Sequence, residues 1–107
     1  MPDFNDVLSS FANGLKELAR TAFSDVRTAA ISDGTAFVQM SQDDIKRWID
    51  LLAAQQITKT DFQFLLMSEK DLAELAALKR AGLSLVRLDQ FRSSLIHLIV
   101  DSVFKLL

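Results

Sequence analysis

Apolar residues recur every eleven positions along the first half of this 107-residue chain. One such row consists of Phe4, Leu15, Val26, Phe37 and Trp48, and the rows beside it are also largely apolar. Eleven residues make three turns at about 3.67 residues per turn, close to the α-helical value of 3.6. The apolar side chains therefore form one nearly straight stripe with mostly polar residues opposite. This periodicity predicts one long amphipathic helix over about residues 3–54.

The segment Ile31–Phe37 is the place where this helix could break. It contains Ser-Asp-Gly-Thr, which is typical of a helix end followed by a new N-cap. Gly34 also costs about 1 kcal/mol in a helix interior. The stripe keeps its phase across the segment, however, whereas a loop would normally reset it. We therefore expect the helix to continue through Gly34, and a break there is the alternative.

A turn is expected at residues 55–58, because Thr58 can cap a following helix and Asp61 stands three residues later. Ile57 and Phe62 are placed to form a hydrophobic staple across this helix start. Good helix formers then dominate, so a second helix is expected over about residues 59–106. With three glycines and one proline, the chain is predicted to be all-α, a single helical-hairpin domain of two long amphipathic helices. Each helix would be roughly 70 Å long at 1.5 Å per residue.

The turn carries a local resemblance to a known family. Residues 57–62 read Ile-Thr-Lys-Thr-Asp-Phe, which resembles the turn of small bacterial helical-hairpin oligomerisation modules with a Gly-x-Ile-Thr-x-x-Glu-Phe pattern. Gln55 stands at the glycine position of that pattern. The resemblance covers only the turn and the helix start, so it does not assign the chain to the family. The Trp-x-Gly secretion proteins are of similar length, but their motif is absent around Trp48.

Two acids, Asp33 and Asp44, fall inside the apolar stripe. A buried carboxylate needs a partner, and a buried ion pair adds little stability but can fix the register of a hairpin. The alternative is that the stripe drifts, or that the helix breaks at Gly34, and that both acids are exposed. In an antiparallel hairpin the facing candidates are Lys79 and Arg80 for Asp33, and Glu69 and Lys70 for Asp44.

The C-terminal segment Ser93–Leu107 is more apolar than a hairpin can cover. Its apolar side chains span an arc of about 240° on a helical wheel, and one partner helix covers only one side. Burial of a large apolar side chain is worth about 1.5–3 kcal/mol, so the uncovered side is a strong drive for association. We expect a second copy of the chain, or alternatively another helical protein, to complete an oligomeric helical bundle. The expected oligomer interface consists of Ile96, Val100, Val103, Phe104 and Leu107.

The residue inventory offers little for catalysis or for nucleic-acid binding. The sequence has no cysteine and one histidine, His97, and it contains no Gly-rich phosphate loop and no metal-spaced cluster. We therefore expect no cofactor, no metal site, no nucleophile–base set and no enzymatic turnover. The net charge of −2 gives no electrostatic case for nucleic acid.

These features together predict a non-enzymatic helical oligomerisation or interaction protein. A membrane-surface or membrane-inserting protein is the alternative, because the apolar arc of the tail is so wide. Its polar side carries Asp101 and Lys105 rather than the Lys/Arg-rich face that is typical of membrane-surface helices. The sequence shows no signal peptide and no spanning segment, so a cytoplasmic location is expected.

Overall fold

The computed structural model describes residues 3–69 and 74–107, and the regular structure in these ranges is entirely helical. The all-α prediction is therefore confirmed, but the two-helix hairpin is wrong. The longest axis of the molecule is 41 Å and its radius of gyration is 13.4 Å, which is too compact for helices of roughly 70 Å. The helices are α1 (Phe4–Ala22), η1 (Ser24–Val26, a short 3₁₀ helix), α2 (Arg27–Met40), α3 (Gln42–Ala53), α4 (Lys59–Met67), α6 (Ala76–Arg80) and α7 (Leu85–Leu106).

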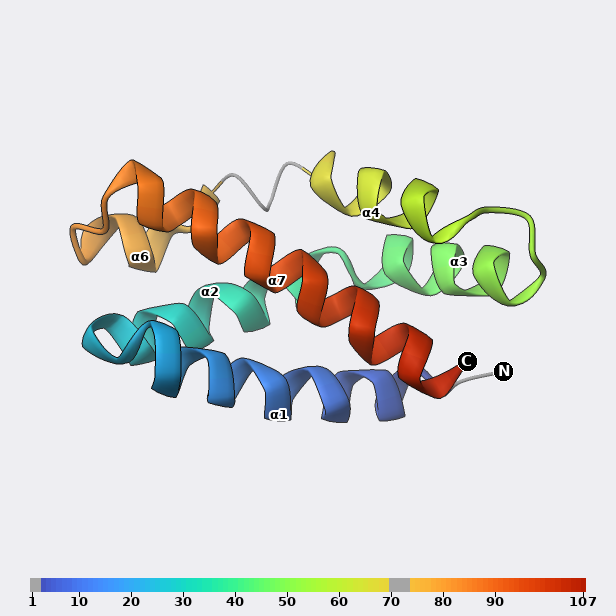
Figure 1. The fold of residues 1–107 in the computed structure, drawn as a ribbon, viewed down its shortest axis with the longest axis horizontal. Helices are drawn as coiled ribbons and strands as arrows, with labels where there is room; N and C mark the ends of the chain where they lie inside the picture. Colours follow the sequence, from blue (N-terminus) through green and yellow to red (C-terminus); the bar gives the residue numbers. More distant parts are fainter. Residues whose placement is uncertain (1–2, 70–73) are drawn as a thin grey trace.

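Helix α7 crosses the molecule diagonally and joins two antiparallel helix pairs (Figure 1). Helix α1 turns back as α2 to form the first pair, and α3 turns back as α4 to form the second. Helix α7 packs on α1 and on α4, and the short helix α6 packs on α2. The same chain therefore covers α7 from more than one side, which a hairpin could not do.

The predicted first helix breaks twice, and neither break is at Gly34. Phe23 (φ −133°, ψ 37°) and Val26 (φ −130°, ψ 31°) leave the helical conformation, so α2 folds back onto α1. Ser41 (φ −98°, ψ 10°) separates α2 from α3. The residues spaced by eleven are still buried together, because each of the shorter helices turns its apolar side toward the same core. Its members Phe4, Leu15, Val26, Phe37 and Trp48 lie in this core or pack against it.

The guanidinium of Arg87 in α7 binds and stabilises the turn between α1 and α2. It donates to the two carboxylate oxygens of Asp25 at 2.5 and 2.9 Å, and to the backbone carbonyl of Ala22 at 3.4 Å. It also lies 5.4 Å from the ring centroid of Phe23, and that ring packs edge-on against Phe91. The hydrogen bonds from Arg87 lower the pKa of Asp25. A side chain from α7 thus binds one of the carbonyls at the end of α1, where intrahelical partners run out.

Gly34 lies in the middle of α2, at the point where three helices meet. A β-carbon at this position would lie 2.8 Å from both Cδ atoms of Leu15 in α1 and 3.3 Å from Cδ1 of Leu95 in α7. Both leucines are fully buried, with exposed fractions of 1% and 0%. The glycine therefore permits a close approach of the helices, and it does not mark a helix end.

Replacement of Gly34 by alanine should destabilise the protein by about 1–3 kcal/mol, because the added methyl group overpacks a rigid part of the core. Gly14 provides the matched control, since a β-carbon there also meets a leucine, Leu98. Leu98 is only partly buried, so the end of its side chain can move. The helix-propensity gain of about 1 kcal/mol is the same at both positions, so Gly14→Ala should be closer to neutral because Leu98 can move away. Urea unfolding of both variants measures the difference, and equal losses would contradict this account of Gly34.

A capping box starts α4. The Thr58 hydroxyl accepts from the backbone N–H of Asp61 at 3.1 Å, and the Asp61 carboxylate accepts from the backbone N–H of Thr58 at 2.9 Å. The backbone N–H of Thr58 and then its hydroxyl, both acting on the carboxylate, lower the pKa of Asp61. Phe62 is fully buried and Ile57 packs against the core beside it. The capping signal read from the sequence is therefore confirmed at residue level.

Helices α3 and α6 end in the same backbone motif, but the left-handed residue of the motif is a different amino acid in each. After α3, Gln55 lies in the left-handed region (φ 59°), and the N–H groups of Gln55 and Gln56 donate to the carbonyls of Leu52 and Leu51. This is the hydrogen-bond pattern of a Schellman motif, whose left-handed residue is usually glycine. After α6 the equivalent position is Gly82 (φ 81°). Gln55 therefore bears a conformational strain that Gly82 does not.

Replacement of Gln55 by glycine should raise the free energy of unfolding by about 0.5–1 kcal/mol, because glycine adopts the left-handed conformation without a steric penalty. The converse change, Gly82→Ala, should lower it by a similar amount. A β-carbon at Gly82 meets nothing within 4 Å, so that change tests the backbone conformation alone. Thermal melts of the two variants should shift in opposite directions, and a shift in the same direction would contradict the shared motif.

Candidate functional site

The apolar C-terminal helix does not present the interface that the sequence suggested. Ile96, Val100 and Val103 have exposed fractions of 6%, 1% and 0%, so they belong to the core of the single chain. The expectation assumed that one partner helix faces α7, whereas α1 and α4 both pack on it. Of the five expected interface residues, Phe104 and Leu107 remain at the surface, with exposed fractions of 36% and 50%.

Asp33 is buried and caps a different helix. Its exposed fraction is 9%, and its two carboxylate oxygens accept from the backbone N–H groups of Ala77 at 3.1 Å and Leu78 at 2.8 Å. These amides belong to the first turn of α6, where N–H groups have no intrahelical acceptor. The sequence suggested the side chain of Lys79 or Arg80 as the partner. The backbone amides just before those residues take that place, because α6 points its N-terminus at Asp33.

Asp44 has a different environment from Asp33. It lies in the first turn of α3 and accepts from the guanidinium of Arg47 at 2.8 Å, with 38% of its side chain exposed. The expected neighbour Lys70 lies outside the described residues. Asp44 is therefore half-exposed and paired within its own helix, because the break at Ser41 changes the direction of the stripe.

Asp33→Asn should destabilise the protein by about 1.5–3 kcal/mol, because the amide nitrogen would face a backbone N–H and a charge-assisted hydrogen bond would be lost. Asp44→Asn is the matched control. It removes the same charge from an exposed pair, so the free energy of unfolding should change by less than about 1 kcal/mol. Chemical denaturation measures both values, and a neutral Asp33→Asn would show that this cap contributes little.

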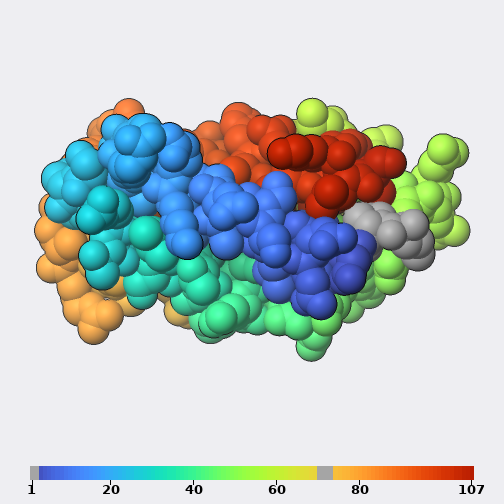
Figure 2. Space-filling view, turned by 90° about the horizontal axis from the view of Figure 1, so that it is seen from below, coloured from blue at the N-terminus to red at the C-terminus, as the bar shows by residue number. Residues whose placement is uncertain are grey.

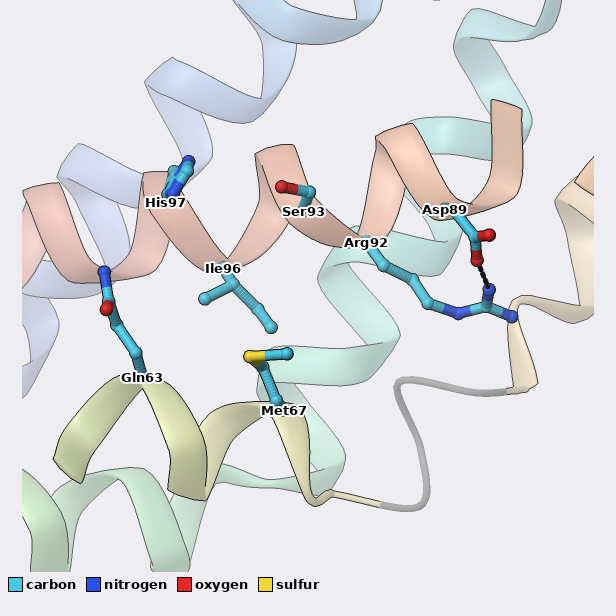
Figure 3. Close-up of a pocket in the computed structure, with 7 residues that line it drawn as sticks. All are labelled: Gln63, Met67, Asp89, Arg92, Ser93, Ile96 and His97. Carbon is cyan, nitrogen blue, oxygen red and sulfur yellow. Dashed lines mark hydrogen bonds and ion pairs between the residues drawn. The ribbon is translucent and has the colours of Figure 1, made fainter. Parts of the chain in front are cut away.

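A groove between α4 and α7 is the candidate functional site. It has a volume of about 340 Å³ and is lined by Gln63, Met67, Asp89, Arg92, Ser93, Ile96 and His97. Met67 on α4 and Ile96 on α7 point toward one another across it (Figure 3). Ile96 is nearly covered, whereas 61% of Met67 is exposed. The groove thus has a buried apolar residue, Ile96, on its floor and an exposed apolar residue, Met67, on one wall.

An exposed aromatic side chain stands beside this groove. Phe64 has an exposed fraction of 65%, and it follows Gln63 by one residue and precedes Met67 by three. On an α-helix this spacing places Phe64 on the face next to those two residues. Helix α4 therefore carries an exposed apolar ridge, defined here as Phe64 and Met67, along the edge of the α4–α7 groove.

The rim of the groove on α7 is polar and carries both signs of charge. The guanidinium of Arg92 donates to the carboxylate of Asp89 at 2.8 Å (Figure 3). His97, the one histidine of the chain, is exposed at the same rim. The described residues contain no group of three or more His, Cys, Asp or Glu side chains that could hold a metal ion. The groove therefore combines two apolar side chains, Met67 and Ile96, with a polar rim on α7.

The groove and the ridge were not among the sites predicted from the sequence. A usable signal was present, because the segment Phe62–Met67 is apolar on nearly every side. A helix that is apolar all round cannot be covered by one neighbour. In α4 the buried side consists of Phe62 and Leu66, which leaves Phe64 and Met67 at the surface.

Comparison with protein-family models, with curated proteins and with solved structures gives no match. The function of this groove must therefore be argued from its own geometry. Among the helices in the described ranges, none is long and apolar enough to cross a membrane.

Proposed function

We propose that this chain is a non-enzymatic interaction protein that pairs with a second copy of itself through the α4–α7 groove and the adjoining ridge. The observation that carries the proposal is the exposure of Phe64 next to a groove with an apolar floor. A cavity of roughly 150 Å³ holds a benzene molecule, so a groove of about 340 Å³ has room for a phenyl ring. Insertion of Phe64 into the groove of another copy would remove the apolar surface of both from water.

The surface is self-complementary, which is what a symmetric dimer requires. In a two-fold interface the same patch meets itself, so each protrusion must find a depression on the same patch. Here the ridge of Phe64 and Met67 lies alongside the groove. A two-fold axis through this surface places the ridge of each copy at the groove of the other.

The charges of the rim fit the same arrangement. Asp89 and Arg92 carry opposite charges. Because these charges cancel, two copies would not repel each other at this surface. A two-fold axis also allows the exposed carboxylate of one copy to approach the guanidinium of the other, which supports a fixed register. The proposal requires no chemistry at His97, and we expect no turnover by the purified protein.

Substitution of the ridge tests the pairing. Wild-type protein should show a mass of about twice 12.0 kDa in light scattering at high concentration, and Phe64→Asp combined with Met67→Asp should show the mass of one chain, because buried unpaired carboxylates are strongly unfavourable. Leu85→Asp combined with Val86→Asp is the matched control. Leu85 and Val86 are at least as exposed as the ridge residues, at 78% and 67%, but they belong to another surface, so the dimer should persist. A wild-type protein that stays at the mass of one chain would overturn the proposal.

Cross-linking locates the interface independently, because the sequence contains no cysteine. A single Met67→Cys variant should join two chains with a short bis-maleimide reagent, since the ridges lie near the two-fold axis. A Leu85→Cys variant should give few cross-linked dimers, because Leu85 lies outside the proposed interface. Equal cross-linking at both positions would show random collision and would contradict the proposed interface.

A further inference from the structure

The turn between α6 and α7 presents two adjacent apolar side chains at one end of the molecule. Leu85 and Val86, the first residues of α7, have exposed fractions of 78% and 67%. They follow Gly82, whose positive φ creates the sharp turn, and Ser84, whose hydroxyl caps α7. Figure 1 shows that this turn lies at the extreme end of the long axis. Leu85 and Val86, called the apolar tip below, follow this turn directly and are largely exposed.

Basic side chains surround this tip. The turn between α1 and α2 lies at the same end of the molecule (Figures 1 and 2), and the ion pair between Arg87 and Asp25 joins the two turns. Residues 17–29 and 79–89 together contain five basic and three acidic side chains, although the whole chain has a net charge of −2. Arg27 and Arg80 are both exposed there. The end that carries the apolar tip is therefore positive, while the rest of the molecule is acidic.

The direction of α7 adds to this positive potential. The tip residues form the first turn of a 22-residue helix, where the helix dipole places about half a positive charge. The three acids at this end are each paired with an arginine, Glu17 with Arg20, Asp25 with Arg87 and Asp89 with Arg92. These pairs are close to neutral, so the positive charge at this end rests on the remaining basic residues, which include Arg27 and Arg80.

We propose that this end of the molecule docks on an anionic lipid surface, with Leu85 and Val86 entering the interface and Arg27 and Arg80 contacting the headgroups. A bilayer interface offers both phosphate groups and an apolar layer, which matches basic side chains around an apolar tip. A nucleic acid would meet the same charges but has no comparable place for two aliphatic side chains. A protein interface of standard size buries roughly 800 Å² on each partner, and two adjacent aliphatic residues are too few to form an apolar surface of that size.

Vesicle flotation tests the docking with the full chain. Wild-type protein should float with vesicles made of equal parts of phosphatidylcholine and phosphatidylserine. It should float far less with phosphatidylcholine alone, and its binding should weaken at high salt, because added ions screen exposed charges. Arg27→Gln combined with Arg80→Gln should weaken binding to the mixed vesicles about 25-fold, from about five-fold for each basic residue.

The apolar part of the contact has its own variant and control. Leu85→Ser combined with Val86→Ser should weaken binding by about ten-fold or more, because two aliphatic side chains no longer enter the interface. Met40→Ser is the matched control, since Met40 is 60% exposed at the end of α2 that is remote from the tip. It should leave vesicle binding unchanged. All variants alter exposed side chains, and thermal melts check that the fold is retained.

Two results would overturn this assignment. One is equal recovery of wild-type protein with both kinds of vesicle, or recovery with neither. The other is a tip variant that still floats but has lost its oligomeric mass in light scattering. That second result would make the tip a protein–protein contact instead of a lipid-binding one.

Discussion

The close approach at Gly34 is the constraint on which the arrangement of the helices depends. The absence of a side chain lets Leu15 of α1 and Leu95 of α7 contact the backbone of α2, so three helices meet at one point. With a larger residue here α1 could not lie this close to α2, and α7 could not settle against both. The chain folds back at Phe23, Val26 and Ser41, and the close approach at Gly34 lets the resulting short helices pack together. This compactness in turn buries the apolar tail within one chain.

Two charged side chains stabilise the ends of the short helices, and each forms hydrogen bonds with backbone groups far away in sequence. Asp33 in α2 accepts from the amides at the start of α6. Arg87 in α7 donates to a carbonyl at the end of α1 and to Asp25 in η1. Broken helices leave backbone groups without intrahelical partners, and these side chains supply some of the partners. The place of Asp33 in the apolar stripe thus follows from the helix breaks, because a continuous second helix would have had no free end for it to bind.

The sequence predicts which residues form the core better than it predicts how the chain is folded. The row from Phe4 to Trp48 was expected on one buried face, and it does lie in or against one core. An eleven-residue repeat cannot distinguish a continuous helix from helices that fold back, since each piece keeps its apolar side inward. Phe23 and Ser41 leave the helix without glycine or proline, so no strong local signal marks them. The helix start at Thr58 was readable because its capping box involves residues three apart in the sequence.

The candidate surfaces were harder to predict, because an exposed apolar residue is recognised only once the rest of the core is known. The tail looked like an interface since its apolar arc exceeded what one helix could cover, yet α1 and α4 cover it from two directions. Apart from the last residues of α7, which include Phe104 and Leu107, the exposed apolar pairs are Phe64 and Met67 on α4 and Leu85 and Val86 on α7. Their exposure means that they contribute little to the stability of the single chain. Single exposed apolar residues need no explanation, whereas neighbouring pairs beside a groove or within a basic surface are what a binding site requires. The two pairs also differ in their surroundings, because a groove with charges of both signs adjoins the first and more basic than acidic residues lie at the end of the molecule that carries the second. The surface proposed to pair with a second copy and the surface proposed to dock on lipid are therefore separate features of the fold, and each can be altered without touching the core.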